Sequence, residues 1–336
     1  MNAPRAVATS LTASIALLCA TLLSPAADHA ALGAQGAPLL TLADTALFPE
    51  GISRDAARAR WLVSSVRNRT VVAVADDGTI TPFARGLPAD VGAILGIRVD
   101  SARGVLWATS AGLPPMAGYQ PRDTARAMVL RLALADGRLL QRIDLPGADT
   151  ARTPGDVVVA RDGTAYVSDA TAKRIYVIAS DGRVVRTITS PWFHSVQGLV
   201  LMPDGASLIA ADYRHGLVRV PLAAGDTATR IMTPEGQRAQ GIDGLALHRG
   251  ALIATHNGSS PGRVLRITLS EDGRTIAGLE VLERLDGTGE PTLGEVHGDA
   301  FIYIPNSPWP AFDAAGNRRP DVPLWRPEIR RLPLPR

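Results

Sequence analysis

The chain has 336 residues, of which 46% are hydrophobic, and a net charge of +3. This composition is typical of a globular protein long enough to bury a sizeable core. Lys173 is the only lysine, so 34 of the 35 basic residues are arginine, and they are scattered among Asp and Glu without a basic run of five. Nucleic-acid-binding surfaces usually show clustered basic charge, so we expect no nucleic-acid partner.

Residues 1–27 have the pattern of a cleavable signal peptide. A short positive start that ends at Arg5 precedes an apolar stretch from Leu11 to Leu23, and Ser24-Pro25-Ala26 offers small residues for cleavage. The apolar stretch has about 13 residues, whereas a membrane-spanning helix needs about 20. We therefore expect a periplasmic or secreted protein without a membrane span.

The only cysteine, Cys19, lies inside this predicted signal peptide. An alternative is a lipoprotein anchored through Cys19, although the bulky Leu18 stands where a small residue is preferred. After cleavage the mature chain would contain no cysteine, and therefore neither disulfides nor thiolate chemistry. Residues 28–38 are expected to form a short flexible lead-in.

From residue 39 to residue 336 a short pattern recurs, in which one residue is followed by glycine and an aliphatic run. The middle residues of the six instances are separated by 45, 60, 42, 46 and 50 positions. Propeller blades run about 40 to 50 residues, so the spacing predicts six blades. The four clear instances and the two weaker ones are Glu50-Gly51-Ile52, Leu95-Gly96-Ile97, Gln197-Gly198-Leu199 and Asp243-Gly244-Leu245, then Gly155-Asp156-Val157 and Leu293-Gly294-Glu295.

Each unit continues with a second, β-rich strand and a third strand in which apolar and polar residues alternate. Asp-Gly pairs such as Asp77-Gly78 and Asp181-Gly182 follow the third strand and favour a tight hairpin, because both residues accept a positive φ. The pattern predicts an all-β fold, a six-bladed β-propeller. A strand without a partner, Leu39 to Leu42, precedes the first unit, and we expect it to close the ring as the outer strand of the last blade.

Two connections between second and third strands are unusually long. They span Gly112 to Arg126 in the second unit and Asn306 to Trp325 in the sixth. Both should lie on the face where the inner strands begin. Long loops within compact domains are often lids or binding loops, so we expect them to border the functional site.

The residue before each repeated glycine should point at the mouth of the central channel, where Glu50, Gln197 and Asp243 bring side-chain oxygens together. Carboxylates aimed at one point repel each other unless a cation neutralises them. Oxygen ligands suit a hard divalent cation, and we expect calcium, with magnesium, manganese and zinc left open. In an alternative reading, the acidic residues at these strand starts, Asp156 included, brace one blade on the next through backbone N–H groups.

These residues carry a resemblance to the regucalcin–gluconolactonase family of six-bladed propellers. Glu50-Gly51 and Asp243-Gly244 match two ligand positions of the single cation that this family holds at its channel mouth. Gln197 stands where the family has Asn, and Gly155-Asp156 stands where it has Asn-Asp. The third unit also resembles NHL-repeat blades, in segments 155–159 and 162–169. The resemblance implies lactone hydrolysis, with Asp243 acting both as a metal ligand and as the base that activates water.

The expected function is therefore hydrolysis of a lactone or related ester, of the sugar-acid type, by a monomer. The alternatives are a non-catalytic propeller that binds a small molecule or a partner protein, and a metal-assisted enzyme of another kind. Histidines in loops are often simply solvated, but we expect five residues to contact the substrate: Asp156, Tyr213, His256, Asn257 and Asn306.

Overall fold

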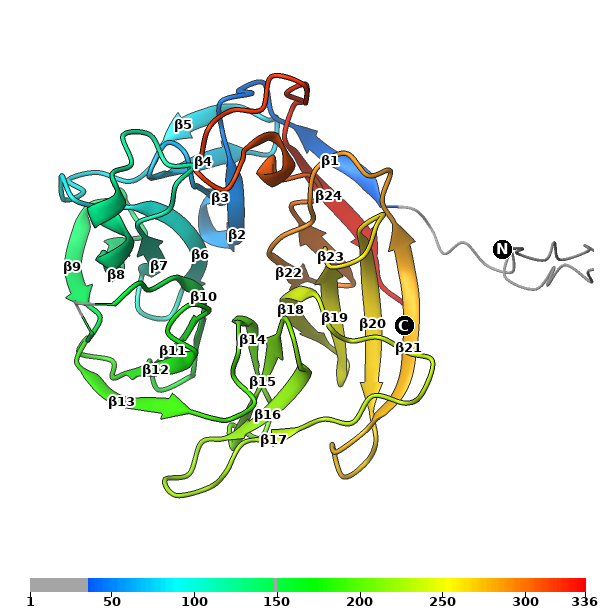
Figure 1. The fold of residues 1–336 in the computed structure, drawn as a ribbon. Helices are drawn as coiled ribbons and strands as arrows, with labels where there is room; N and C mark the ends of the chain where they lie inside the picture. The colour runs from blue at the N-terminus through cyan, green and yellow to red at the C-terminus, as the bar shows by residue number, and fades with distance from the viewer. Residues whose placement is uncertain (1–35, 148–149) are drawn as a thin grey trace, which may run out of the picture. The chain divides into compact units, whose positions relative to one another are not determined.

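The computed structural model describes residues 36–147 and 150–336, so the predicted signal peptide and most of the predicted lead-in lie outside the described residues. Within those ranges, 24 β-strands form six four-stranded antiparallel sheets, which are arranged around a common centre as the blades of a propeller (Figure 1). The predicted all-β fold and the number of blades are confirmed. Of the described residues, no helix is long and apolar enough to cross a membrane.

Every blade is named here from its inner strand outward. The first two blades consist of β2 (Pro49–Asp55), β3 (Arg60–Ser65), β4 (Thr70–Ala75) and β5 (Ile80–Pro82), then β6 (Ala93–Asp100), β7 (Val105–Ala111), β8 (Ala127–Ala133) and β9 (Leu139–Asp144). The third and fourth consist of β10 (Pro154–Val159), β11 (Ala165–Asp169), β12 (Arg174–Ile178) and β13 (Val184–Thr189), then β14 (Val196–Leu201), β15 (Ser207–Asp212), β16 (Gly216–Pro221) and β17 (Thr229–Arg230). The fifth and sixth consist of β18 (Ile242–His248), β19 (Ala251–His256), β20 (Arg263–Leu269) and β21 (Ile276–Arg284), then β22 (Gly294–His297), β23 (Ala300–Tyr303), β24 (Glu328–Pro333) and β1 (Ala37–Thr41).

The N-terminal strand closes the ring, as predicted. β1 pairs antiparallel with β24, with Thr41 opposite Glu328 and Ala37 opposite Arg331. Figure 1 shows this pairing as a blue strand beside a red one. The strand begins two residues before the predicted Leu39 and ends one residue before the predicted Leu42. Because the last blade takes its outer strand from the other end of the chain, first and last blades are held together by backbone hydrogen bonds.

The hydrophobic core lies between neighbouring blades. One cluster joins Leu62 of the first blade to Ile97 and Leu130 of the second, and all three are buried. Another joins Trp107 of the second blade to Tyr176 of the third. Since each sheet buries both of its faces against its neighbours, apolar residues occur on both sides of the middle strands, and the blades form one ring rather than separate units.

The inner strands of the first five blades each contain a β-bulge at the glycine step. The register shifts between Pro49 and Ile52 in β2 and between Ile242 and Leu245 in β18, and the same irregularity occurs in β6, β10 and β14. A bulge takes residues out of the regular ladder and re-aims their side chains. The residues released in this way include Glu50 in β2 and Asp243 in β18.

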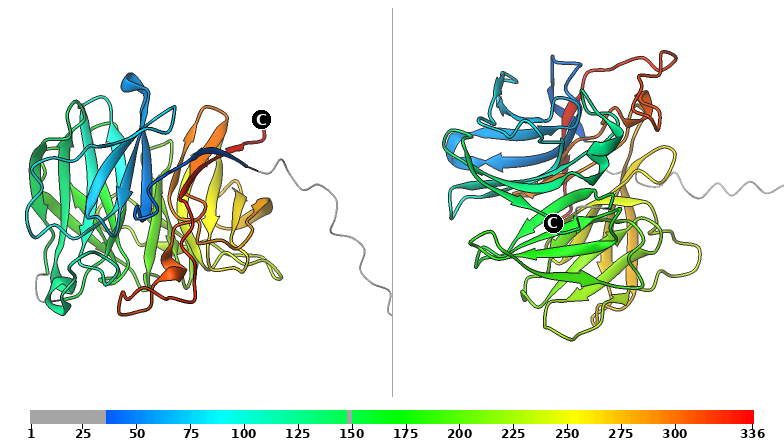
Figure 2. Two further views of the ribbon diagram at one scale, coloured as in Figure 1. Left: turned by 90° about the horizontal axis from the view of Figure 1, so that it is seen from above. Right: turned by 60° about the vertical axis from the view of Figure 1, so that its left-hand side comes forward.

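The two long loops extend from the same face of the ring, as predicted (Figure 2). The second-blade loop contains the short 3₁₀-helix η2 (Pro121–Ala125), and the sixth-blade loop contains η3 (Trp309–Ala311). A third such helix, η1 (Ala56–Arg58), follows β2 at the opposite face. The long loops contact each other, because a Cβ atom built on Gly316 would lie 2.1 Å from the carbonyl oxygen of Pro114.

Candidate functional site

Glycine is required at the bulges because adjacent inner strands approach closely there. A Cβ atom on Gly51 would lie 2.5 Å from the carbonyl oxygen of Leu95, and one on Gly198 would lie 2.4 Å from that of Asp243. Real Cβ atoms do not make such contacts, so only glycine allows the blades to meet here. The residue before each repeated glycine thus lies at the start of an inner strand. The region where the inner strands begin is called the channel mouth below.

Hydroxyl groups on the second strand β3 and in the segment before β22 fix this arrangement. Ser64 Oγ accepts a hydrogen bond from the Gly51 N–H at 2.7 Å and donates to the Leu95 carbonyl at 2.6 Å. Thr292 Oγ1 of the sixth blade donates to the Glu50 carbonyl at 2.8 Å. These bonds join one blade to the next, so the backbone that carries Glu50 is held from both sides.

Glu50 is buried at the channel mouth and contacts the sixth-blade loop. Its Oε2 accepts a hydrogen bond of 2.7 Å from Trp309 Nε1 in η3. Burial raises the pKa of Glu50 well above its usual value, and the nearby charge of Asp243 raises it further, while the Trp309 bond opposes the shift. Glu50 of the first blade therefore interacts electrostatically with Asp243 of the fifth blade, although the two are far apart in the chain.

Asp243 lies on β18, where Asn257 Nδ2 donates a hydrogen bond of 3.0 Å to its Oδ2. Burial raises the pKa of Asp243 to about 7, with further contributions from the charges of Glu290 and Asp156. The other amide atom, Asn257 Oδ1, is buried and has no hydrogen-bond partner among the described residues. Asn257 Oδ1 and the Asp243 carboxylate are thus neighbouring buried acceptors, which a hydrogen-bond donor or a cation could bind.

Glu290 is a third carboxylate at this mouth, and the sequence analysis did not find it. It lies in the loop before β22, where its N–H and C=O pair with those of Ser307 at 3.0 and 2.8 Å. Burial raises its pKa, and its charge raises those of Glu50 and Asp243. In the sixth blade the repeat frame pointed to Leu293. The sequence feature that could have pointed to Glu290 is the Gly289-Glu290-Pro291 segment just before that strand.

Gln197, predicted as a cation ligand, begins the inner part of the fourth blade. Its Nε2 donates a hydrogen bond of 2.9 Å to Ser195 Oγ. Its Oε1 points toward the third blade, where a Cβ atom built on Gly155 would lie 3.9 Å from that oxygen. The Gln197 amide oxygen therefore lies beside Gly155 of the neighbouring blade.

The donor set at the channel mouth consists of oxygens from carboxylates and amides, which is the chemistry that calcium accepts. The side chains concerned are Glu50, Gln197, Asp243, Asn257 and Glu290. Among the described residues, no three His, Cys, Asp or Glu side chains are already spaced to enclose a metal ion. The residues thus fit a cation in their chemistry, and the carboxylates would have to move together to enclose one.

Asp156 occupies a different environment, on the inner strand of the third blade. Its Oδ1 accepts a hydrogen bond from its neighbour Val157 at 2.7 Å, and its Oδ2 accepts one from Leu199 of the fourth blade at 2.9 Å. Both oxygens are therefore engaged by backbone N–H groups, which corresponds to the bracing alternative considered for this residue. Its charge still acts on the site, by raising the pKa of Asp243.

His256 is buried at the end of β19 with both ring nitrogens engaged. Nε2 lies 2.7 Å from the Gln240 carbonyl, and Nδ1 lies 2.9 Å from Arg263 Nε. A carbonyl must receive a proton and a guanidinium must donate one, so the ring is neutral with its proton on Nε2. Burial and the charge of Arg263 lower the pKa of His256 to about 4. The ring is neither solvated nor open to a ligand.

The remaining two predicted residues, Tyr213 and Asn306, differ in their exposure to solvent. Tyr213 is 39% exposed, and burial together with the charges of Asp243 and Glu290 raises its pKa, so it lies beside the carboxylates. Asn306 is buried, and its amide is used by the backbone of the returning loop. Its Nδ2 donates to the Arg326 carbonyl at 3.1 Å and its Oδ1 accepts from the Glu328 N–H at 2.9 Å.

Comparison with known proteins identifies the fold. No known protein family and no curated protein matches the sequence. Solved structures do match. A gluconolactonase from Xanthomonas campestris has 16% identity and a TM-score of 0.58, with 88% of this chain and 89% of that one covered. The chain has the fold of the gluconolactonases and related six-bladed propellers.

Two further matches show how widely this fold is used. A protein described as a putative oxidoreductase (glucose dehydrogenase) from Thermus thermophilus has 16% identity and a TM-score of 0.61, covering 89% of this chain and 99% of its own. Virginiamycin B lyase from Staphylococcus aureus has 17% identity and a TM-score of 0.57, covering 81% of each chain. At these identities the likeness concerns the fold alone, so function has to be argued from the site.

Proposed function

We propose that this protein hydrolyses a lactone or related ester at the channel mouth, with the help of a divalent cation. The observation that carries the proposal is a group of three carboxylates where the inner strands begin, Glu50, Asp243 and Glu290, all with raised pKa values. Burial raises each of them, the charge of Glu290 raises those of Glu50 and Asp243, and the charge of Asp243 raises that of Glu50. Strongly perturbed carboxylates at the mouth of a channel are typical of functional sites, because a fold seldom keeps unmatched buried charge for stability alone.

A cation would relieve this repulsion. Glu50, Asp243 and Glu290 would supply carboxylate oxygens, and Asn257 and Gln197 would supply amide oxygens, a set that suits calcium. When bound, the cation would supply positive charge that polarises the ester carbonyl. Its presence would also favour ionised carboxylates and so lower their pKa values.

Asp243 is proposed as the base. Its ionised carboxylate takes a proton from water while the water oxygen bonds to the carbonyl carbon. The ring C–O bond then breaks, the proton passes to the departing ring oxygen, and the product is the open hydroxy acid. Burial raises the pKa of Asp243 to about 7, and a bound cation would lower it, so the carboxylate would be ionised at neutral pH. The hydrogen bond from Asn257 holds the Asp243 carboxylate in one orientation.

Tyr213 is proposed to contact the substrate, because its side chain is partly exposed beside the carboxylates. Asn257 would contribute through its unpaired amide oxygen. Asp156, His256 and Asn306 would act from behind the site, since their polar atoms already hold backbone or side-chain partners. We further propose that the mature chain acts as a monomer in the periplasm or outside the cell.

A second candidate is a propeller that binds a small molecule without converting it. The observation in its favour is that Glu50 and Asp243 already accept N–H groups, from Trp309 and Asn257. Hydroxyl groups of a polyol could replace these donors, and no chemical step is needed for recognition.

A panel of lactones, assayed for acid release with and without a chelator, tests both candidates. We expect turnover by the wild type, loss of turnover on chelation, and recovery on adding calcium. Asp243→Asn should remove turnover, whereas the matched control Asp162→Asn, in an exposed turn, should not. Binding of lactones without turnover would favour the second candidate, and the absence of both binding and turnover would contradict both.

A further inference from the structure

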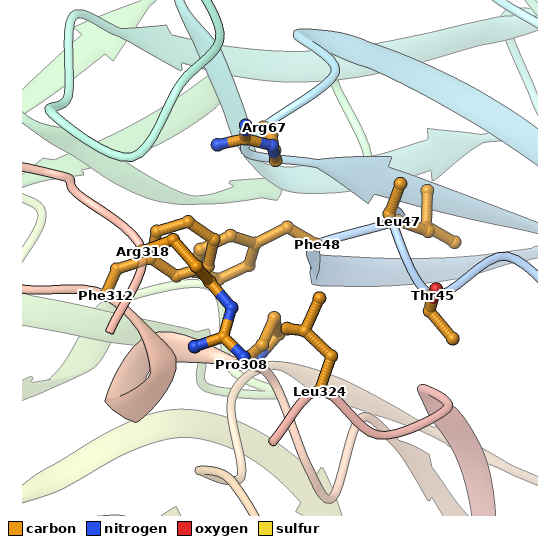
Figure 3. Close-up of a pocket in the computed structure, with 9 residues that line it drawn as sticks. Thr45, Leu47, Phe48, Arg67, Pro308, Phe312, Arg318 and Leu324 are labelled. Carbon is orange, nitrogen blue, oxygen red and sulfur yellow. The ribbon is translucent and has the colours of Figure 1, made fainter. Parts of the chain in front are cut away.

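A pocket that none of the proposed site residues lines lies between the segment before β2 and the sixth-blade loop. It has a volume of about 210 Å³ and is lined mainly by apolar groups (Figure 3). An enclosed space of about 150 Å³ is enough for a benzene ring, so this pocket has room for one ring-sized group. The proposed hydrolysis does not use this cavity.

The wall of the pocket is aromatic and firmly packed. The rings of Phe48 and Phe312 stack with centroids 5.3 Å apart and planes inclined by 22°. Phe48 is 1% exposed and also packs edge-on against Trp309 at 4.9 Å. Leu324, by contrast, is 44% exposed at the rim, so the pocket opens to solvent through an apolar edge. An aromatic ligand would bury this edge.

Two arginines border the pocket, and within the described ranges neither forms an ion pair with a carboxylate. Arg67 is exposed and lies 5.5 Å from the Phe312 ring, with one long hydrogen bond of 3.5 Å to the Pro115 carbonyl. Figure 3 shows Arg67 and Arg318 on opposite sides of the Phe48–Phe312 pair. Both therefore bring positive charge to the edge of an apolar cavity, where an anion would be attracted.

Arg318 is held in place by the loop itself. Its guanidinium donates to the backbone carbonyls of Ala311, Arg319 and Val322. A guanidinium has five N–H donors, so donors remain for a ligand, and carbonyl groups do not neutralise its charge. Asp321, whose pKa the charge of Arg318 helps to lower, is exposed and pairs with Arg319 at 3.1 Å. The positive charge of Arg318 is thus preorganised at the pocket.

We propose that this pocket binds a small aryl carboxylate, with the ring against Phe48 and Phe312, the carboxylate at Arg67, and the charge of Arg318 adding to the attraction. The ligand would be distinct from the substrate at the channel mouth. Phe48 lies between the two regions, because it also packs against Trp309, whose indole N–H bonds to Glu50. The proposal does not depend on lactone hydrolysis.

Calorimetric titration of the full chain with phenylacetate tests this inference. We expect one binding site and affinity at least about tenfold above that of the neutral isostere phenylacetamide, since a charged hydrogen bond separates the two. Phenethylamine, which carries the opposite charge, should not bind. Equal affinity for phenylacetate and phenylacetamide would overturn the role of the arginines.

Variants localise the site. Arg67→Met should weaken phenylacetate about tenfold, whereas the control Arg331→Met, an exposed arginine of β24 that does not line the pocket, should not. Ala46→Phe, at an exposed position of the lining, should fill the cavity and abolish binding. Glu50→Gln and Asp243→Asn should bind phenylacetate like the wild type. Binding that survives Ala46→Phe, or that is lost in Asp243→Asn, would place the ligand at the channel mouth and overturn the proposal.

Discussion

Two groups of buried acidic side chains in this propeller are treated in opposite ways. Between the fifth and sixth blades, Glu283 accepts hydrogen bonds from Tyr303 at 2.8 Å and from Arg330 at 3.0 Å, so its charge is matched by a cation. At the channel mouth, burial raises the pKa values of Glu50, Asp243 and Glu290, and the charge of Glu290 raises those of the other two further.

The difference separates structural charge from functional charge. Asp212 in the fourth blade shows the structural pattern again, because its two oxygens accept four backbone N–H groups at 2.7 to 3.1 Å. Asp156 also has both oxygens bonded to backbone N–H groups, although burial still raises its pKa. Only a ligand could match the charges at the mouth in this way, so the two groups should respond differently to substitution, to pH and to cations.

The largest expected effect is on turnover. Asp243→Asn should lower the rate of lactone hydrolysis about a thousandfold, because an amide cannot accept the proton from water. Without added cation the same variant should be at least as resistant to urea as the wild type, since a repelled buried charge is removed. A variant that retains wild-type turnover would show that Asp243 is not the base.

The next effect concerns stability and the other group. Glu283→Gln should lower the free energy of unfolding by about 3 kcal/mol. The reason is that the largely buried guanidinium of Arg330 loses the negative charge of Glu283. Denaturant titration measures this. The control is Glu280→Gln on the same strand, whose contact with Arg266 is long at 3.9 Å and exposed, and which should cost less than about 0.5 kcal/mol. Equal effects at both positions would remove the contrast between buried and exposed pairs.

The stability of the cation-free protein should depend on pH through Asp243 at the channel mouth. The pKa of Asp243 is raised from 3.8 to about 7, so the folded protein binds a proton that the unfolded chain has lost between these values. The free energy of unfolding should therefore fall as the pH rises from about 4 to about 7. Asp243→Asn should flatten this part of the profile. A wild-type profile that rises over the same interval would contradict the sign.

The smallest expected effect comes from the loop that covers Glu50. Trp309→Phe keeps an aromatic ring against Phe48 and removes only the N–H donor to Glu50, which should destabilise the fold by about 1 kcal/mol. Trp325→Phe is the control, because its indole donates to the uncharged Asn306 carbonyl instead. Only Trp309→Phe should also shift the titration of Glu50 upward.

Most of the fold could be predicted from the sequence, because it depends on local rules that recur. The glycine steps reflect backbone contacts between blades, the Asp-Gly pairs mark hairpins, and both survive as short motifs. Even the closing strand could be predicted, since it was the one strand without a neighbour in its own unit.

The site could be predicted only where it follows the repeat. Glu50 and Asp243 follow it, and their positions at the inner strand starts were anticipated. Glu290 lies in a turn before the strand, outside the frame, so the spacing pointed to Leu293 instead. The engagement of His256 and Asn306 depends on side chains and carbonyls distant in sequence, such as Gln240 and Arg326. Hydrogen-bond partners of this kind leave no mark in a repeat pattern.

Calcium titration of chelator-treated protein, followed by calorimetry, tests the central claim most directly. The wild type and Glu283→Gln should each bind one ion. The double variant Glu50→Gln, Asp243→Asn should bind none, because the carboxylates that would hold the ion are gone. Absence of binding to the wild type, or unchanged binding to the double variant, would contradict the assignment of the channel mouth as the functional site.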